Sequence, residues 1–121
     1  MLSIAPEKQE SLAMKLIAPA CLFAALAASA GAPAQSPAQA LHLAEEKGCM
    51  ECHAIGWKVV GPAFVDVATR YRYDPEARRT LVDKVRFGGK RHWGERFNMW
   101  PQTNLDDEEV TVLVDWILSQ Q

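Results

Sequence analysis

The stretch Gly48-Cys49-Met50-Glu51-Cys52-His53-Ala54 lies near the middle of a chain of 121 residues. Its central five residues contain two cysteines separated by two residues and followed directly by a histidine, which is the attachment motif of a c-type haem. The two thiols can form thioether bonds with the two vinyl groups of one porphyrin, and His53 is then held beside the iron as an axial ligand. We therefore expect one covalently attached haem c, bound through Cys49 and Cys52.

Three other uses of a cysteine pair fit this sequence less well. A zinc site needs a second cysteine or histidine pair, but no cysteine follows the motif and His92 stands alone. A thioredoxin-like redox pair follows a strand in a βαβ pattern, which the sequence lacks. A plain structural disulfide gives no reason for the adjoining His53. Haem attachment is the interpretation that uses all three residues.

The N-terminal part has the pattern of an export signal. Residues 16–28 carry no charge, follow Lys15 and precede small residues, as in a secretory signal peptide. We expect residues 1–30 to be removed and residues 31–121 to form the folded domain; acidic residues before Met14 suggest that Met14 is the true start. Three cleavage sites fit, the first preferred: after Ala30, Ala34 or Ala40.

An uncleaved membrane anchor is the alternative, because residues 16–34 carry no charge. A spanning helix needs about 20 predominantly apolar residues, and Pro19, Gly31 and Pro33 interrupt this segment. We expect cleavage, no stable membrane insertion afterwards, and a periplasmic protein. Since c-type haem is attached outside the cytoplasm, the signal and the motif support each other. Cleavage also removes Cys21 and leaves the two motif cysteines.

The rest of the chain predicts an all-α domain of about four short helices. Ser36, Pro37 and Gln39 form a helix start with a capping box, and Gly48 marks the end of that helix. Each expected helix carries apolar residues at helical spacing, and no stretch alternates with a period of two. The apolar residues expected in the four helices are Leu41, Leu43 and Ala44; Phe64, Val67 and Ala68; Ala77, Leu81, Val82 and Val85; and Val110, Leu113, Val114 and Ile117.

The expected helix boundaries follow from turn and cap residues. The second helix spans residues 63–71, and the third opens at residues 74–76 and ends at residues 88–89. The last begins at Thr103 or Asn104. A domain of about 85 residues has a small core, so a bound haem would supply needed stability.

The second axial ligand must come from outside the motif. Methionine sulfur is soft and neutral and raises the reduction potential of haem iron. Met50 lies inside the attachment loop, on the same side as His53, whereas Met99 lies in a polar loop far downstream. Met99 is the preferred candidate, with His92 as the competing ligand.

The stretch from Lys47 to Gln121 resembles the small bacterial class I c-type cytochromes, the monohaem electron carriers of the periplasm. The matching pieces, in the family's order, are Gly48 to Ala54, Val60-Gly61-Pro62-Ala63, Phe87-Gly88-Gly89, Trp93-Gly94, Met99 and Leu113 to Leu118. The resemblance implies a few helices wrapped around one covalently bound haem, with the N- and C-terminal helices crossing.

The resemblance also implies a role for individual residues. Cys49 and Cys52 would form the thioether links, His53 would be the proximal ligand and Met99 the distal one. The Pro62 carbonyl would accept the other N–H of His53, and Trp93 would donate to a haem propionate. The chain departs from the family where Met99 lies between Asn98 and Trp100 instead of prolines; Gln102 could donate an amide hydrogen to the methionine sulfur.

A haem with both axial positions filled has no open site for a substrate. We therefore expect no enzyme activity but single-electron transfer between periplasmic redox proteins, with a dehydrogenase or reductase as donor and an oxidase or reductase as acceptor. The alternative is a haem c subunit of a periplasmic dehydrogenase complex, for example one that oxidises a sulfur compound.

The charge pattern excludes nucleic acid and suggests how a partner could dock. Lys and Arg number 13 against 15 Asp and Glu, a net charge of −2, which gives no nucleic-acid footprint. Residues 70–96 hold nine basic and four acidic residues, whereas residues 104–121 hold five acids and no base. Complementary charge steers encounter, so we expect an acidic partner to dock at the basic segment around the exposed haem edge.

Overall fold

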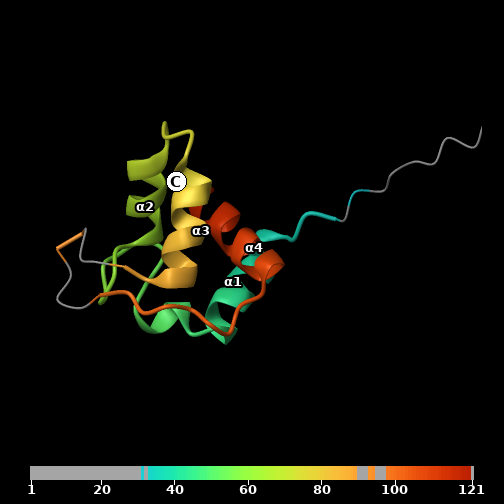
Figure 1. Ribbon diagram of the computed structural model, residues 1–121, viewed down its shortest axis with the longest axis horizontal. Helices are drawn as coiled ribbons and strands as arrows, with labels where there is room; N and C mark the ends of the chain where they lie inside the picture. Colours follow the sequence, from blue (N-terminus) through green and yellow to red (C-terminus); the bar gives the residue numbers. More distant parts are fainter. Residues whose placement is uncertain (1–30, 32, 90–92, 95–97, 121) are drawn as a thin grey trace, which may run out of the picture. The chain divides into compact units, whose positions relative to one another are not determined.

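The computed structural model describes residues 31, 33–89, 93–94 and 98–120. These residues form four α-helices and one 3-10 turn, in the order α1 (Pro37–Glu46), η1 (Cys49–Glu51), α2 (Phe64–Tyr71), α3 (Ala77–Phe87) and α4 (Asp107–Leu118) (Figure 1). Pairing between extended segments in the described part is limited to two isolated bridges, His53 with Lys58 and Gly89 with Met99. The all-α prediction is confirmed. The expected signal peptide, residues 1–30, lies outside the described residues.

Helix α1 begins where the sequence predicts. The Gln39 amide donates to the Ser36 hydroxyl oxygen at 3.3 Å, and the Ser36 amide donates to the Gln39 side chain at 2.8 Å, which completes the capping box. The residues that α1 buries are Ala40 and Ala44, while Leu41 and Leu43 are only partly buried. Small side chains on this face let α1 pack closely against α4.

Helix α4 is the centre of the domain and packs against α1, α2 and α3 (Figure 1). It buries the expected Val110, Leu113, Val114 and Ile117 and also Trp116. Its predicted start at Thr103 or Asn104 is wrong, because α4 begins at Asp107. Asp106 is the N-cap: its carboxylate accepts the Glu109 amide at 2.8 Å, and Glu109 accepts the Asp106 amide at 3.0 Å.

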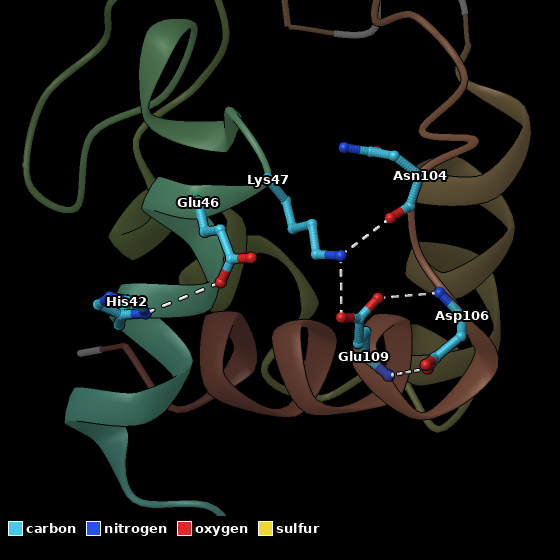
Figure 2. A network of polar contacts seen from close by, with 6 residues as sticks. All are labelled: His42, Glu46, Lys47, Asn104, Asp106 and Glu109. Carbon is cyan, nitrogen blue, oxygen red and sulfur yellow. Dashed lines mark hydrogen bonds and ion pairs between the residues drawn. The ribbon is translucent and has the colours of Figure 1, made fainter.

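A lysine joins the end of α1 to the start of α4 (Figure 2). The Lys47 ammonium lies 2.9 Å from the Glu109 carboxylate and donates to the Asn104 carbonyl at 3.1 Å. Its hydrogen bond lowers the pKa of Glu109 and raises the pKa of Lys47. On the outer face of α1, His42 lies 4.0 Å from Glu46, and both side chains are exposed.

Ion pairs fasten α3 to α4. Arg78 donates to both oxygens of Asp115 at 2.7 and 2.9 Å, and Arg86 pairs with Asp107. The basic segment and the acidic helix therefore neutralise each other in part, and docking of an acidic partner at the basic segment stays a prediction. Within the described part of the chain, we find no helix long and apolar enough to cross a membrane.

Candidate haem site

The attachment loop is a tight turn that follows α1. The Cys52 and His53 amides both donate to the Cys49 carbonyl, at 3.3 and 3.0 Å, so the loop doubles back on itself. Cys49 is half-buried and Cys52 is exposed, and both thiols are free. Burial raises the pKa of the Cys49 thiol. The turn brings both thiols and the His53 imidazole to the wall of one cavity.

The His53 imidazole is held from two sides. Its Nδ1 lies 2.8 Å from the Pro62 carbonyl oxygen, which can only accept, so Nδ1 is the donor and Nε2 carries the lone pair. The ring stacks on Phe64 with 5.0 Å between centroids, and Phe64 meets Trp116 of α4 edge-on at 5.4 Å. Metal-bound histidines show this arrangement, in which the second nitrogen is fixed by a carbonyl.

The loop that supplies Pro62 is itself fixed to the attachment turn. The Val60 and Gly61 amides both donate to the Cys52 carbonyl, at 3.1 and 2.7 Å. A Cβ atom at Gly61 would lie 2.5 Å from Cε1 of His53 and 2.9 Å from each ring nitrogen. Only glycine leaves room for the imidazole here.

The cavity has a volume of about 450 Å³, within the range typical of small-molecule and cofactor sites. Its walls come from the attachment loop, from α2, α3 and α4, and from residues 98–102. The buried side chains that line it are apolar: Phe64, Val67, Leu81, Val85, Leu113 and Ile117.

Met99 lies on the same cavity and comes from a different part of the chain. It is half-buried, and its carbonyl accepts the Gly89 amide at 3.0 Å. The next residue, Trp100, is 78% exposed. The Gln102 amide group donates to the Trp100 carbonyl at 2.9 Å, so it does not take the expected place at the Met99 sulfur.

Trp93 also lines the cavity and is held by two cations. The Arg70 guanidinium lies over its ring, 4.5 Å from the centroid, and the Lys58 ammonium donates to its carbonyl at 3.4 Å. Arg70 therefore contacts the site instead of serving only as surface charge. The competing ligand His92 lies outside the described residues.

Lys84 also lines the cavity, although the sequence gives it no separate role at the site. Lys84 follows Leu81 by three positions on α3, which places both on one side of the helix. That spacing is a signal in the sequence for a place beside the core, although a lysine within a basic segment by itself indicates only surface charge. Among the described residues, no group of three or more His, Cys, Asp or Glu side chains is placed to hold a metal ion.

A family model described as Cytochrome c matches residues 37–121. The chain belongs to the cytochrome c family. Members of this family carry one covalently bound haem c, and Cys49, Cys52 and His53 have the required spacing. The cavity fits that group, since it offers two thiols, an imidazole with a free Nε2, and apolar walls.

The relatives of this cytochrome c are small bacterial proteins. It is 42% identical over 78 residues to cytochrome c-551 of Allochromatium vinosum, covering 64% of this chain and 82% of that protein. It is 46% identical over 77 residues to cytochrome c-552 of Hydrogenobacter thermophilus, covering 64% and 76%. These matches support the prediction of a small monohaem cytochrome of class I.

Solved structures agree. Wild-type cytochrome c552 of Nitrosomonas europaea superposes with a TM-score of 0.64 at 36% identity, covering 67% of this chain and 99% of that one. The class 1 cytochrome MtoD of Sideroxydans lithotrophicus gives a TM-score of 0.55 at 32% identity, covering 67% and 91%. The fold is that of a class I cytochrome c.

Proposed function

We propose that this cytochrome carries single electrons on a haem bound through Cys49 and Cys52, with His53 and Met99 as axial ligands. The observation that supports this most strongly is the shared cavity, which Cys49, Cys52, His53 and Met99 all line. When bound, the haem supplies one-electron chemistry at its iron.

The protein's own residues set the conditions for that chemistry. The Pro62 carbonyl fixes the His53 tautomer and makes the imidazole a better donor. Met99 would hold the iron through a soft neutral sulfur, which would favour its reduced state. The apolar walls exclude water and further favour the less charged, reduced state. With both positions filled, the site has no place for a substrate, so we infer that the protein is not an enzyme.

Polar residues at the cavity suit the carboxylate-bearing edge of a haem. Trp93 carries an indole N–H, and we infer that this group donates to a propionate. Arg70 and Lys58 hold Trp93 in place. Lys84 adds an ammonium group to the cavity wall, where a negatively charged propionate would balance it.

We infer that redox proteins meet this cytochrome at the Cys52 side of the cavity. Cys52 is exposed, and Val60, whose amide donates to the Cys52 carbonyl, is 40% exposed; Trp100, another lining residue, is 78% exposed. An apolar rim beside the cofactor favours brief contact with a partner.

We further propose that residues 1–30 direct export and that the mature protein works in the periplasm. No observation favours the alternative of a dehydrogenase subunit.

The test is an absorption spectrum with a redox titration of the exported protein. We expect a covalent haem c spectrum, the weak red-region band of a methionine–iron bond, and one reversible one-electron transition. Native mass determination should give a monomer. A spectrum without covalent haem, or a high-spin spectrum typical of an open axial site, would contradict the proposal.

A further inference from the structure

The segment that carries Met99 lies directly against the C-terminal end of α3. The Gly89 amide donates to the Met99 carbonyl at 3.0 Å, and these two residues form an isolated antiparallel bridge. On the other side of Met99, the backbone amide of Gln102 donates to the Val85 carbonyl at 3.0 Å. Val85 is one of the last four residues of α3, whose carbonyls lack partners within a helix. Residues 99–102 therefore lie along the end of α3 and supply a hydrogen-bond donor to one of its last carbonyls.

Gly88 lies at the centre of this contact. Its backbone angles, φ 68° and ψ −159°, belong to a region that only glycine occupies without strain. A Cβ atom there would overlap the Met99 carbonyl oxygen and lie 2.9 Å from the Pro101 nitrogen and 3.0 Å from the Trp100 carbonyl carbon. All three are backbone atoms, so no side-chain rotation can relieve the overlap.

We propose that Gly88 is a positioning residue that sets where the Met99 sulfur lies in the haem cavity. The proposal rests on ligation by Met99, as proposed above. A side chain at position 88 would displace the backbone of residues 99–101. Because the thioether must reach the iron from that backbone, displacement would weaken the sulfur–iron bond and leave the attachment at Cys49 and Cys52 intact.

The chain offers two matched controls. Gly94 also has a positive φ, 73°, but a Cβ there would meet no atom of the described residues within 4 Å. Gly94→Ala therefore adds backbone strain without pressing on Met99. At Gly89 the three atoms nearest to a Cβ would all belong to the flexible Lys84 side chain, so Gly89→Ala should keep the hydrogen bond from its amide to the Met99 carbonyl.

The experiment compares Gly88→Ala, Gly94→Ala and Gly89→Ala as full-length exported holoproteins. We expect all three to retain covalent haem, shown by staining after denaturing electrophoresis. In Gly88→Ala alone, the methionine–iron band should weaken and added imidazole, which competes with the thioether, should bind about tenfold more tightly or better. If Gly88→Ala matches Gly94→Ala in band intensity and imidazole affinity, the proposal is overturned.

Met99→Ala separates this proposal from the assignment of the ligand. If Met99→Ala keeps the band, the ligand assignment itself fails, whatever Gly88→Ala does. If Met99→Ala abolishes the band and Gly88→Ala leaves it unchanged, only the positioning role fails.

Should Gly88→Ala not accumulate, amide exchange in the wild-type holoprotein gives a second test. Imidazole that displaces Met99 should speed exchange at the Gly89 and Gln102 amides by about tenfold or more, because both bonds hold the same segment. The Leu113 amide in α4 should not change. Unchanged exchange at Gly89 and Gln102 would overturn the proposal.

Discussion

The Nδ1 hydrogen of His53 is donated to the Pro62 carbonyl across 2.8 Å, which leaves the lone pair of the neutral imidazole on Nε2. The neighbouring Gly61 makes this contact possible, because any side chain there would collide with the imidazole ring. Pro62 thus accepts the hydrogen bond from His53, and Gly61 leaves room for the imidazole ring.

Gly61→Ala should tilt the His53 ring and weaken its bond to Pro62. Overpacking at such a site costs about 1–3 kcal/mol, and loss of the hydrogen bond makes the imidazole a poorer donor, so the reduction potential should rise. Thermal unfolding and redox titration measure the two effects. Gly56→Ala is the control, since a Cβ there lies more than 4 Å from every neighbouring atom in the part of the chain that the structure describes. Equal stability and potential in both variants would contradict the role given to Gly61.

Glu109→Gln should lower the Tm more than Glu108→Gln does. Both changes remove one acid from the first turn of α4, but only Glu109 pairs with Lys47 and takes part in the capping box. Because Lys47 lowers the pKa of Glu109, this stabilisation is present above the ordinary pKa of a glutamate and is lost as the pH falls through the lowered value. Thermal melts of wild type and Glu109→Gln should therefore converge in acid. Melts that stay equally far apart at all pH values would argue against the ion pair.

The pair also acts at high pH through Lys47, with the opposite sign. Because the pKa of Lys47 is raised, its contribution to the stability of the fold is present below the ordinary lysine pKa of 10.5 and is lost as the pH rises through the raised pKa. Stability should therefore fall again in strong alkali, and less so in Glu109→Gln.

Arg70→Gln should destabilise the holoprotein by about 0.5–1 kcal/mol, the size of an exposed cation–π contact. The reason is the loss of the guanidinium that lies over the Trp93 ring. Arg72→Gln is the control, because Arg72 is an exposed arginine at the C-cap of the same helix. Denaturant unfolding of both variants gives the comparison, and equal losses would show that the contact with Trp93 contributes nothing.

Leu113→Ala should cost about 2–5 kcal/mol, because Leu113 is 1% exposed, belongs to the core and lines the cavity. Val112→Ala, one residue earlier and only partly buried, should cost clearly less. Thermal or denaturant unfolding of the holoproteins measures both. If Leu113→Ala lowered the free energy of unfolding no more than Val112→Ala does, the role of Leu113 in the core would be contradicted.

The sequence predicted those features that depend on residues close together in the chain. The capping box of Ser36 and Gln39, the stripe of Phe64 and Val67, and the attachment motif all lie within a few positions, so spacing alone defines them. The start of α4 was misplaced because Thr103 and Asn104 are also good cap residues. Asp106 is chosen by its reciprocal bonds with Glu109, which Lys47 reinforces from α1.

The remaining features depend on tertiary packing. The basic and acidic segments looked separate, yet Arg78 meets Asp115 once α3 packs against α4. The residues near Gly88 in the sequence do not predict that residues 99–101 lie against it. The position of Gln102 in the sequence allows it to donate to the Met99 sulfur, but its side-chain amide donates to the carbonyl of Trp100, two residues before it. These contacts form because a later part of the chain packs against the end of α3, and the spacing of residues in the sequence does not predict that packing.

The central claim is that His53 and Met99 ligate a covalently bound haem, and a redox titration of Met99→Ala tests it most directly. The variant should keep its covalent haem, lose the methionine–iron band and show a markedly lower reduction potential, because a soft sulfur ligand is gone. Met50→Ala, which changes the methionine inside the attachment loop, should keep both the band and the potential. A Met99→Ala protein that retains the band at an unchanged potential would contradict the account.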